Sequence, residues 1–545
     1  MSYVNNQSVN AAINKTYALT NYKIHNDMHK QHKFQKQIIL DDKSLKENEK
    51  SEAIRMLTKT YDKGKIVYNE GTKRICENCN QECLATLFCE HCVQNYLKEK
   101  FSNWTSGNND IDKLIQECQM KIIAPDSIAE WIPYNNLQNI KYFTKGGFSE
   151  IYTAEWIDGA YSEWDSKKKK LKRFGETGIV QTVILKNLEN VESANQSWFE
   201  EAKSHLTISN KWADIVQCFG LTQNPSNGNY MLVMNKMDID LRKYLEQNHN
   251  QLAWKEKIQI VIFIILALSR IHRENAIHRD LHSGNILYKK DERFYISDLG
   301  FCGPADKPLK SIYGNLPYIA PEVIIGKEQT FKSDIYSIAM LMWEISSGQP
   351  PFINYEHDYY LAMNIVNGIR PKIVPGTPLE YKNLMKQCWD ADPLKRPDID
   401  TLLTKLSEIN LIHESSELLT QLEKLDISNL KNYTSSSSKI HQFENLSEPR
   451  NAMEEEQEAF HSKLYDFNIP DNINDFDKPN NQESSTLNIA NIFQVKNEET
   501  FKKNEEIMQK QIKRDHVNFD DENEIHNDPN LHPEEQDELE LPDNI

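Results

Sequence analysis

The sequence predicts an α+β fold in which a strand-rich part of the chain is followed by a helical part. Apolar and polar residues alternate from about Ile140, and residues 182–186 (TVILK) and 230–234 (YMLVM) have the composition of further strands. The most apolar run, Ile260–Leu268, contains nine residues, whereas a membrane-spanning helix needs about 20. We therefore interpret this run as a buried helix and expect no association with membranes.

The charge of the chain disfavours several classes of partner. Its 545 residues carry a formal net charge of −18, so we expect no general attraction to nucleic acid or to anionic lipid. The first residues lack the basic stretch and apolar core of a secretory signal, so we expect a cytoplasmic protein. Residues 166–173 (SKKKKLKR) leave nuclear import open as an alternative, although a solvated loop between strands is the favoured interpretation.

Both ends of the chain are predicted to be disordered. Residues 1–44 are rich in Asn, Lys, Gln and His, and residues 430–545 are acidic with few apolar residues that could pack together. Such segments cannot bury enough apolar surface to offset the loss of chain entropy on folding.

Residues 70–98 contain a cysteine module. Two CxxC pairs, Cys76 with Cys79 and Cys89 with Cys92, supply four thiolates that could hold one tetrahedral Zn²⁺ at about 2.3 Å per sulfur. A segment this small has little core of its own, so metal binding would supply much of its folding free energy. We expect a structural zinc site, and we expect that the module could bind a protein partner. Free or redox-active thiols are the alternative.

Helices are predicted on both sides of the cysteine module. Residues 46–60 contain an apolar patch that favours a short helix packed on a neighbour. Residues 99–130 are expected to form a helical linker, with Asp110 as the N-cap of its helix and Pro125 ending it.

Three side chains in residues 276–300 (AIHRDLHSGNILYKKDERFYISDLG) indicate phosphoryl transfer from a nucleotide. Asn285 and Asp298 offer the oxygen ligands that Mg²⁺ prefers. Asp280 lies five residues before Asn285, where its carboxylate could accept the proton of an attacking hydroxyl group.

These residues carry a resemblance to a known family. HRDLHSGN is similar to the HRDLxxxN catalytic loop of eukaryotic protein kinases, and DLG stands where that family has DFG. The resemblance covers residues 134–412 and implies a bilobal fold, with a small β-rich N-lobe and a helical C-lobe. The segments GNLPYIAPEV and CWDADPLKRP resemble the tyrosine-kinase-like group, whose members mostly phosphorylate serine and threonine.

The resemblance implies a role for each residue of the site. Lys186 would bind the α and β phosphates of ATP and would be held by Glu201, with Glu200 as the alternative partner. Asp280 would be the base, and Asn285 and Asp298 would bind Mg²⁺. The glycine-rich loop (KYFTKGGFSEIYTAEW) departs from GxGxxGxV, and Ile184 stands where the family has a small Ala. The predicted nucleotide-binding residues are Gly146, Gly147, Phe148, Ile151, Ile184, Lys186, Met234, Asn235, Met237 and Leu287.

Residues 298–322 resemble an activation loop. Arg279 beside the base suggests that phosphorylation orders this loop, and Ser311 and Tyr313 are the nearest candidate hydroxyl groups. In the helical lobe, Asp334 would brace the catalytic-loop backbone, and Arg396 would pair with Glu322.

The expected function is ATP-dependent phosphorylation of protein Ser and Thr residues in signalling. His282 and Asn315 stand where Ser/Thr kinases of the family usually have Lys and Thr, so dual or tyrosine specificity is the alternative. The other alternative is a pseudokinase scaffold that binds ATP without efficient transfer.

Overall fold

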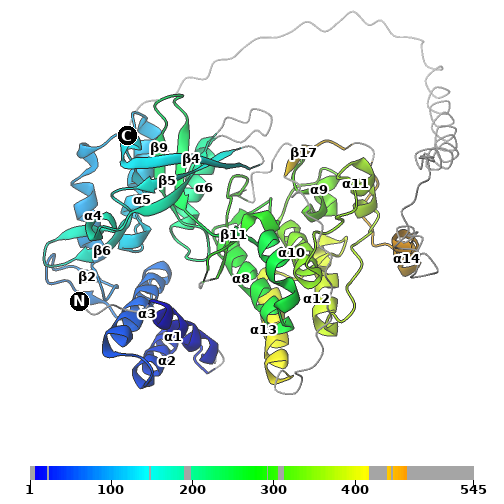
Figure 1. Ribbon diagram of the computed structural model, residues 1–545, viewed down its shortest axis with the longest axis horizontal. Coiled ribbons are helices and arrows are strands. Elements are labelled where there is room, and N and C mark those ends of the chain that lie inside the picture. The colour runs from blue at the N-terminus through cyan, green and yellow to red at the C-terminus, as the bar shows by residue number, and fades with distance from the viewer. Residues whose placement is uncertain are drawn as a thin grey trace, which may run out of the picture. The chain divides into compact units, whose positions relative to one another are not determined.

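The computed structural model describes residues 6–20, 24–146, 149–188, 198–290, 293–304, 312–416, 438–443 and 446–462. All of them belong to one compact unit, residues 1–465, of the two units into which the chain divides. Figure 1 shows the order of the helices and strands along the chain.

The N-terminal region contains a small group of helices, which corrects the prediction of disorder for residues 6–20 and 24–44. Its helices are α1 (Asn6–Leu19), α2 (Met28–Asp41) and α3 (Glu47–Tyr68). Apolar residues of all three helices and of the turn before α3 form one buried cluster: Val9, Ala12, Ile13, Ile39, Leu45, Ala53 and Leu57. Residues 1–44 alone are too polar to build a core, but α3 completes one with them.

The cysteine module is a short hairpin followed by a helix. Strands β1 (Arg74–Ile75) and β2 (Glu82–Cys83) pair antiparallel, and α4 (Glu90–Lys98) follows. Val93 and Leu97 of α4 are buried in a cluster that also contains Trp164 and Leu171 from a second hairpin. The module therefore packs on a neighbouring part of the chain and does not fold around its cysteines alone.

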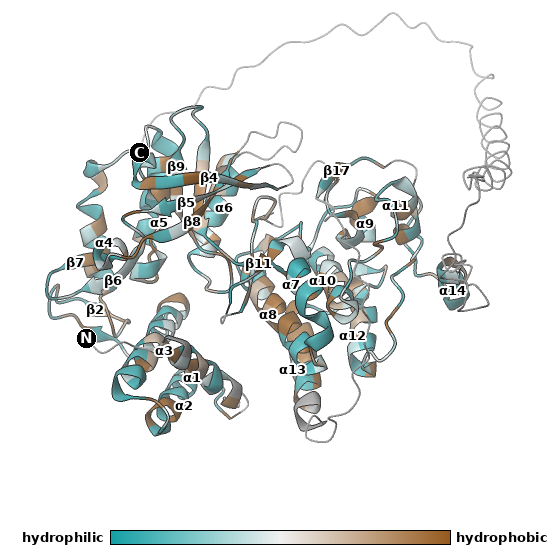
Figure 2. Ribbon diagram, viewed as in Figure 1, coloured by the Kyte–Doolittle hydropathy of each residue, from teal (hydrophilic) through white to brown (hydrophobic). Residues whose placement is uncertain are grey.

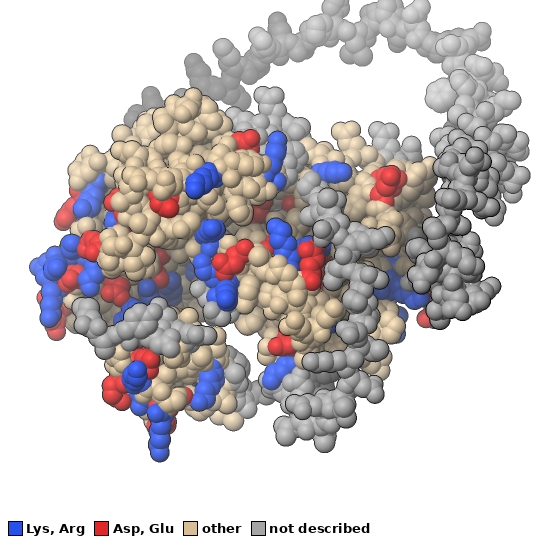
Figure 3. Space-filling model, viewed as in Figure 1, with Lys and Arg blue, Asp and Glu red and all other residues tan. Residues whose placement is uncertain are grey.

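The second hairpin contains the basic segment 166–173, which we expected to be a loop. Its strands are β6 (Tyr161–Asp165) and β7 (Lys170–Arg173), and they pair antiparallel. Figure 3 shows lysine and arginine interspersed with acidic residues in this region. Arg173 is paired with Glu130, and Lys172 lies 3.7 Å from Glu163. The alternation that buries Trp164 and Leu171 explains why the segment forms a strand.

The small lobe is built on one six-stranded sheet. In spatial order its strands are β3 (Glu130–Trp131), β9 (Cys218–Gln223), β10 (Tyr230–Asn235), β8 (Gln181–Asn187), β5 (Glu150–Trp156) and β4 (Leu137–Lys145). The pairs are antiparallel except for β3 and β9, which are parallel. The central strands β8 and β10 carry the predicted TVILK and YMLVM segments.

Residues 99–130 belong to the small lobe, which corrects their interpretation as a linker. Helix α5 (Asn109–Met120) buries Ile111, Leu114 and Ile115 in a cluster with residues of the sheet. Its N-cap is Asn108, not Asp110, because the Asn108 side chain accepts the backbone N–H groups of Asp110 and Ile111.

The large lobe is helical. Its helices are α7 (Leu241–Asn248), α8 (Trp254–Arg273), α9 (Pro321–Ile324), α10 (Phe331–Ser347), α11 (Tyr359–Val366), α12 (Leu379–Cys388) and α13 (Ile399–Ser416). The apolar run Ile260–Leu268 lies in α8 as predicted, and Figure 2 shows the apolar residues gathered there. Within the described ranges, no helix combines the length and apolar character needed to cross a membrane. The bilobal α+β fold is confirmed.

Part of the C-terminal tail is ordered, which corrects the predicted disorder of residues 430–545 at two places. Strand β17 (Lys439–His441, orange in Figure 1) pairs with β16 (Ile312–Gly314), and α14 (Glu454–Ser462) follows. Apolar residues around these elements pack on the core of the large lobe: Phe443, Leu446, Ala452 and Phe460. The tail has too few apolar residues for its own core, but they are enough to dock on an existing one.

Candidate active site

The catalytic loop follows β12 (Ala276–Ile277) and is held by a buried carboxylate. Asp334 of α10 accepts the backbone N–H groups of His278 at 2.9 Å and Arg279 at 3.1 Å. It also contacts His272 Nε2 at 2.9 Å and is 1% exposed. The predicted bracing role of Asp334 is confirmed. These bonds fix the backbone directly before Asp280, including Arg279 at a positive φ of 71°.

Lys186 lies between two carboxylates. Its ammonium group is 2.8 Å from Glu201 Oε1 of helix α6 (Trp198–Ser204) and 2.7 Å from Asp298 Oδ1. Glu200, the alternative partner, points to solvent. Burial disfavours the charged ammonium, but the Asp298 and Glu201 carboxylates outweigh it and raise the pKa of Lys186.

The same cluster shifts the pKa values of its two carboxyl groups in opposite directions. Burial raises the pKa of Glu201, and the neighbouring Lys186 offsets this in part. Burial also acts on Asp298, but there the Lys186 ammonium prevails and lowers the pKa of the carboxyl group. Asp298 is therefore held as the anion that a cation would need.

Asn285 and Asp298 are suited to hold a divalent cation. The Asn285 side chain donates from Nδ2 to the Asp280 carbonyl at 2.9 Å, which orients its Oδ1 as the available ligand atom. The Asp298 side chain is 38% exposed, so its carboxylate is accessible to a cation from solvent. Carboxylate and amide oxygens are the ligands that Mg²⁺ takes, so these residues fit the ion that the resemblance implies.

Four of the ten predicted nucleotide-binding residues come together in one apolar cluster. Met234 is buried in it, and Ile184, Met237 and Leu287 pack against it. Ile151 lies on β5 opposite Lys186 in the sheet register. Asn235 ends β10, and its backbone N–H donates to the Gln217 carbonyl at 2.9 Å. These residues come from four different strands and from the segment after β10.

The glycine-rich loop is described in part. The backbone N–H of Gly146 donates to the Ser149 carbonyl at 2.9 Å, next to the facing ends of β4 and β5. Gly147 and Phe148 lie outside the described residues.

The activation segment, residues 298–322, contains the two candidate phosphorylation sites, and one of them is buried. Tyr313 is 4% exposed, and its ring stacks on Phe301 with the centroids 3.5 Å apart. Ser311 lies outside the described residues. Arg279 Nη1 donates to the Phe301 carbonyl at 3.3 Å.

Two features of the site had not been predicted. His205 lies four residues after Glu201, one turn along the same helical segment, and its Nε2 accepts the backbone N–H of Leu299 at 3.2 Å. Burial lowers the pKa of His205 to about 3, so the ring stays neutral and can accept this bond. The spacing from Glu201 was a signal that could have identified it.

The second feature comes from the distant C-terminal segment. The Ser438 hydroxyl donates to Asp280 Oδ1 at 2.9 Å, although the two residues are 158 positions apart. Sequence spacing gives no signal for such a contact.

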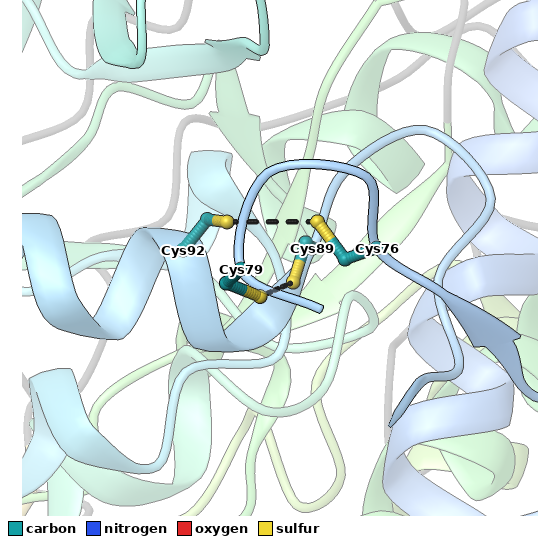
Figure 4. Close-up of side chains that lie close together, drawn as sticks. All are labelled: Cys76, Cys79, Cys89 and Cys92. Atoms are coloured by element: carbon teal, nitrogen blue, oxygen red, sulfur yellow. Dashed lines mark hydrogen bonds between the residues drawn. The ribbon is translucent and has the colours of Figure 1, made fainter. Parts of the chain in front are cut away.

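The four predicted zinc ligands also come together. Figure 4 shows the sulfur atoms of Cys76, Cys79, Cys89 and Cys92 turned toward one another. The Sγ atoms of Cys76 and Cys92 are 3.7 Å apart, those of Cys79 and Cys89 are 3.6 Å apart, and all four lie within 4.8 Å of one another. A tetrahedron with bonds of about 2.3 Å has edges of about 3.8 Å, so the arrangement fits Zn²⁺.

Two other groups of ligand-type side chains fit a metal less well. Cys83, Cys89 and Glu90 are close together, but Glu90 Oε1 accepts the N–H groups of Leu84 and Ala85. Glu201, His205 and Asp298 are also close, but the Lys186 ammonium already bridges the two carboxylates.

Comparison with known proteins agrees with this geometry. Residues 137–406 match the family model of protein tyrosine and serine/threonine kinases. The human dual serine/threonine and tyrosine protein kinase is 33% identical over 171 residues, which are 31% of this chain and 18% of that protein. The probable serine/threonine-protein kinase roco5 of Dictyostelium discoideum is 29% identical over 323 residues, covering 55% of this chain and 11% of that protein. The dual specificity protein kinase zakA of the same organism is 31% identical over 195 residues, covering 32% and 25%.

The fold, the site and these matches define a protein kinase domain of the eukaryotic type. Residues 137–406 of this chain belong to the protein tyrosine and serine/threonine kinase family. Such a domain implies ATP, Mg²⁺ and protein substrates. The chain spans a quarter or less of the length of the three relatives described.

Proposed function

We propose that the chain is a protein kinase that transfers the γ-phosphoryl group of ATP to serine and threonine hydroxyl groups of proteins. The observation that carries the proposal is the cluster of Lys186 with Glu201 and Asp298, which lies in one site with Asp280 and Asn285. A cytoplasmic role in signalling is part of the same proposal.

The mechanism follows from what each side chain can do. ATP with bound Mg²⁺ supplies the phosphoryl group, and the metal offsets its negative charge. Glu201 holds Lys186, whose ammonium group would bind the phosphates, and Asn285 and Asp298 would offer oxygen ligands to the metal. Asp280 orients the acceptor hydroxyl and takes its proton. The contribution of the protein is therefore positioning and fixed charge.

Serine and threonine are the favoured acceptors because a short side chain can reach the base. The Ser438 hydroxyl contacts Asp280 from the position directly before β17, whose backbone is paired with β16. A longer tyrosine side chain at the same backbone position would carry its hydroxyl past the carboxylate. Incubation of the protein with Mg·ATP and casein is expected to yield at least about tenfold more phosphoserine and phosphothreonine than phosphotyrosine. Phosphoamino acid analysis measures this ratio, and equal amounts would favour dual specificity.

The altered glycine-rich loop and the bulky Ile184 favour a second candidate, a scaffold that binds ATP without efficient transfer. Thermal unfolding with and without Mg·ATP, followed by phosphate incorporation into casein, separates the two. A kinase gives a shift and incorporation, whereas a scaffold gives a shift alone.

Activation-loop phosphorylation remains part of the proposal, with Ser311 preferred over Tyr313 because Tyr313 is buried. Full activity of a variant in which both residues are replaced would contradict it.

The cysteine module is proposed to hold one structural Zn²⁺ and to bind a protein partner. Cys76→Ser is expected to abolish stoichiometric zinc and to lower the unfolding temperature of the chain, because the metal supplies much of the folding free energy of such a small segment. Zinc is measured by elemental analysis and unfolding by calorimetry. Cys118→Ser is the matched control, since Cys118 is a free thiol on α5, outside the cluster. Equal zinc content in the two variants would rule out the site.

A further inference from the structure

Strand β17 lies against the activation segment of the same chain. It pairs antiparallel with β16, with Ile312 opposite His441, Tyr313 opposite Ile440 and Gly314 opposite Lys439. The residue directly before β17 is Ser438, which is 8% exposed. The pairing therefore brings one serine from the distant tail into the catalytic site.

The contacts of Ser438 have the polarity that a phosphoryl acceptor needs. Its hydroxyl donates to Asp280 Oδ1 at 2.9 Å, and its Oγ is 3.1 Å from His282 Nε2. The backbone N–H of Gly284 donates to His282 Nδ1 at 3.1 Å, so the ring hydrogen is on Nε2 and faces Ser438. The hydroxyl proton thus points to the base, while Oγ accepts a bond from the imidazole.

The residues after Ser438 hold it in this place. His441 Nε2 lies 3.0 Å from the Gly314 carbonyl, and the His441 ring stacks on Phe443. Phe443 in turn packs on the core of the large lobe. This part of the tail is therefore attached to the two sides of the site, the activation segment and the helical core.

A second set of contacts anchors the tail further along. The backbone N–H of Arg450 donates to the Val366 carbonyl at 3.1 Å, and Gln457 Nε2 donates to the Gly368 carbonyl at 2.7 Å. Gly368 has a φ of +91°, and a Cβ there would lie 2.2 Å from the Ala452 nitrogen. The close approach of the tail thus depends on a glycine in the large lobe.

We propose that residues 438–441 occupy the acceptor-peptide site of their own kinase domain and that Ser438 is phosphorylated in cis. The inference rests on the proposed kinase function. Ser438 Oγ attacks the γ-phosphorus of ATP and forms a new P–O bond. The bond from that phosphorus to the β,γ-bridging oxygen breaks, ADP leaves, and the hydroxyl proton passes to Asp280. The product phosphate carries about −1.5 to −2 charges at pH 7, so Asp280 repels it and β17 leaves the site to other substrates.

The first experiment measures where and how the purified full-length protein labels itself with Mg·ATP. Mass spectrometry is expected to find phosphate on Ser438, at an initial rate per molecule that does not change over a hundredfold range of protein concentration. Ser438→Ala removes this label. Ser447→Ala is the matched control, because Ser447 lies in the same tail, is exposed, and is expected to leave labelling of Ser438 unchanged.

A mixing experiment tests the intramolecular route. The Asp280→Asn chain, incubated with active Ser438→Ala chain, is expected to gain no phosphate on Ser438. Labelling of that serine at a rate that rises with the concentration of active chain would overturn the proposal. Casein phosphorylation without any phosphate on Ser438 would overturn the cis proposal and leave the proposed kinase function intact. Absence of casein phosphorylation and of Ser438 phosphate would overturn both the cis proposal and the kinase function.

Release of β17 from the acceptor site is expected to change the kinetics in a way that a separate variant can test. Ile440→Pro removes a backbone N–H and disfavours the pairing with β16. A tethered segment competes at an effective concentration in the millimolar range, so the variant is expected to have about a tenfold lower KM for an acceptor peptide, with kcat unchanged. Its Ser438 is expected to be labelled more slowly than in the parent chain. An unchanged KM together with unchanged labelling would show that β17 does not occupy the acceptor site.

Discussion

Asp280→Asn is expected to lower the turnover of phosphoryl transfer by at least about a hundredfold. The asparagine amide has nearly the shape of the carboxylate but cannot accept the proton of the attacking hydroxyl. The residues proposed to hold the nucleotide and its metal are Lys186, Asn285 and Asp298, so affinity for Mg·ATP should change by less than about threefold. Single-turnover phosphate incorporation measures the first quantity, and thermal shift against Mg·ATP concentration measures the second.

Asp400→Asn is a suitable control for this substitution. Asp400 is exposed in the first turn of α13, far along the chain from the site residues, and the change removes the same charge. It should leave turnover unchanged. Retention of more than a tenth of the turnover in Asp280→Asn would mean that another group accepts the proton. Loss of nucleotide affinity would mean that the substitution disturbs the site as a whole.

The residues of the site that sequence could identify stand in short local motifs. Asp280 and Asn285 lie on one short loop, and Asp298 follows after a hairpin of β13 (Ile286–Tyr288) and β14 (Phe294–Ile296). Glu201 was preferred over Glu200 because WFEEAK resembles the family pattern in which the acid follows an aromatic or aliphatic pair. The two acids cannot be exchanged, because adjacent residues of a helix point about 100° apart. The structure places Glu201 on the side of Lys186.

The parts that sequence missed depend on contacts between distant segments. Residues 6–20 look too polar to fold when considered alone, yet Val9 and Ile13 are buried in one cluster with Ala53 and Leu57. The tail residue Phe443 docks on a core that the large lobe has already built. Composition describes a segment in isolation, and it therefore underestimates order wherever another part of the chain supplies the apolar partner.

Arg396→Ala is expected to lower the free energy of unfolding by about 3–5 kcal/mol. Arg396 is 1% exposed and pairs with Glu322, which is 5% exposed. Its Nη1 and Nη2 donate to the two oxygens of Glu322 at 2.7 Å each, which confirms the predicted pair, and its Nε donates to the Asp390 carbonyl at 2.8 Å. The substitution would leave a buried carboxylate without its main partner. Urea unfolding followed by circular dichroism measures the change.

The matched control is an arginine that makes the same type of ion pair at the solvent-exposed surface. Arg450 makes a two-pronged pair with Glu456, but their side chains are 48% and 34% exposed. Arg450→Ala should therefore cost less than about 1 kcal/mol. The double variant Arg396→Met with Glu322→Gln removes both buried charges and should be more stable than Arg396→Ala, because the penalty comes mainly from the unpaired carboxylate. A double variant less stable than Arg396→Ala would contradict this explanation. The unpaired charge of Glu322 would then not be the cause of the lost stability.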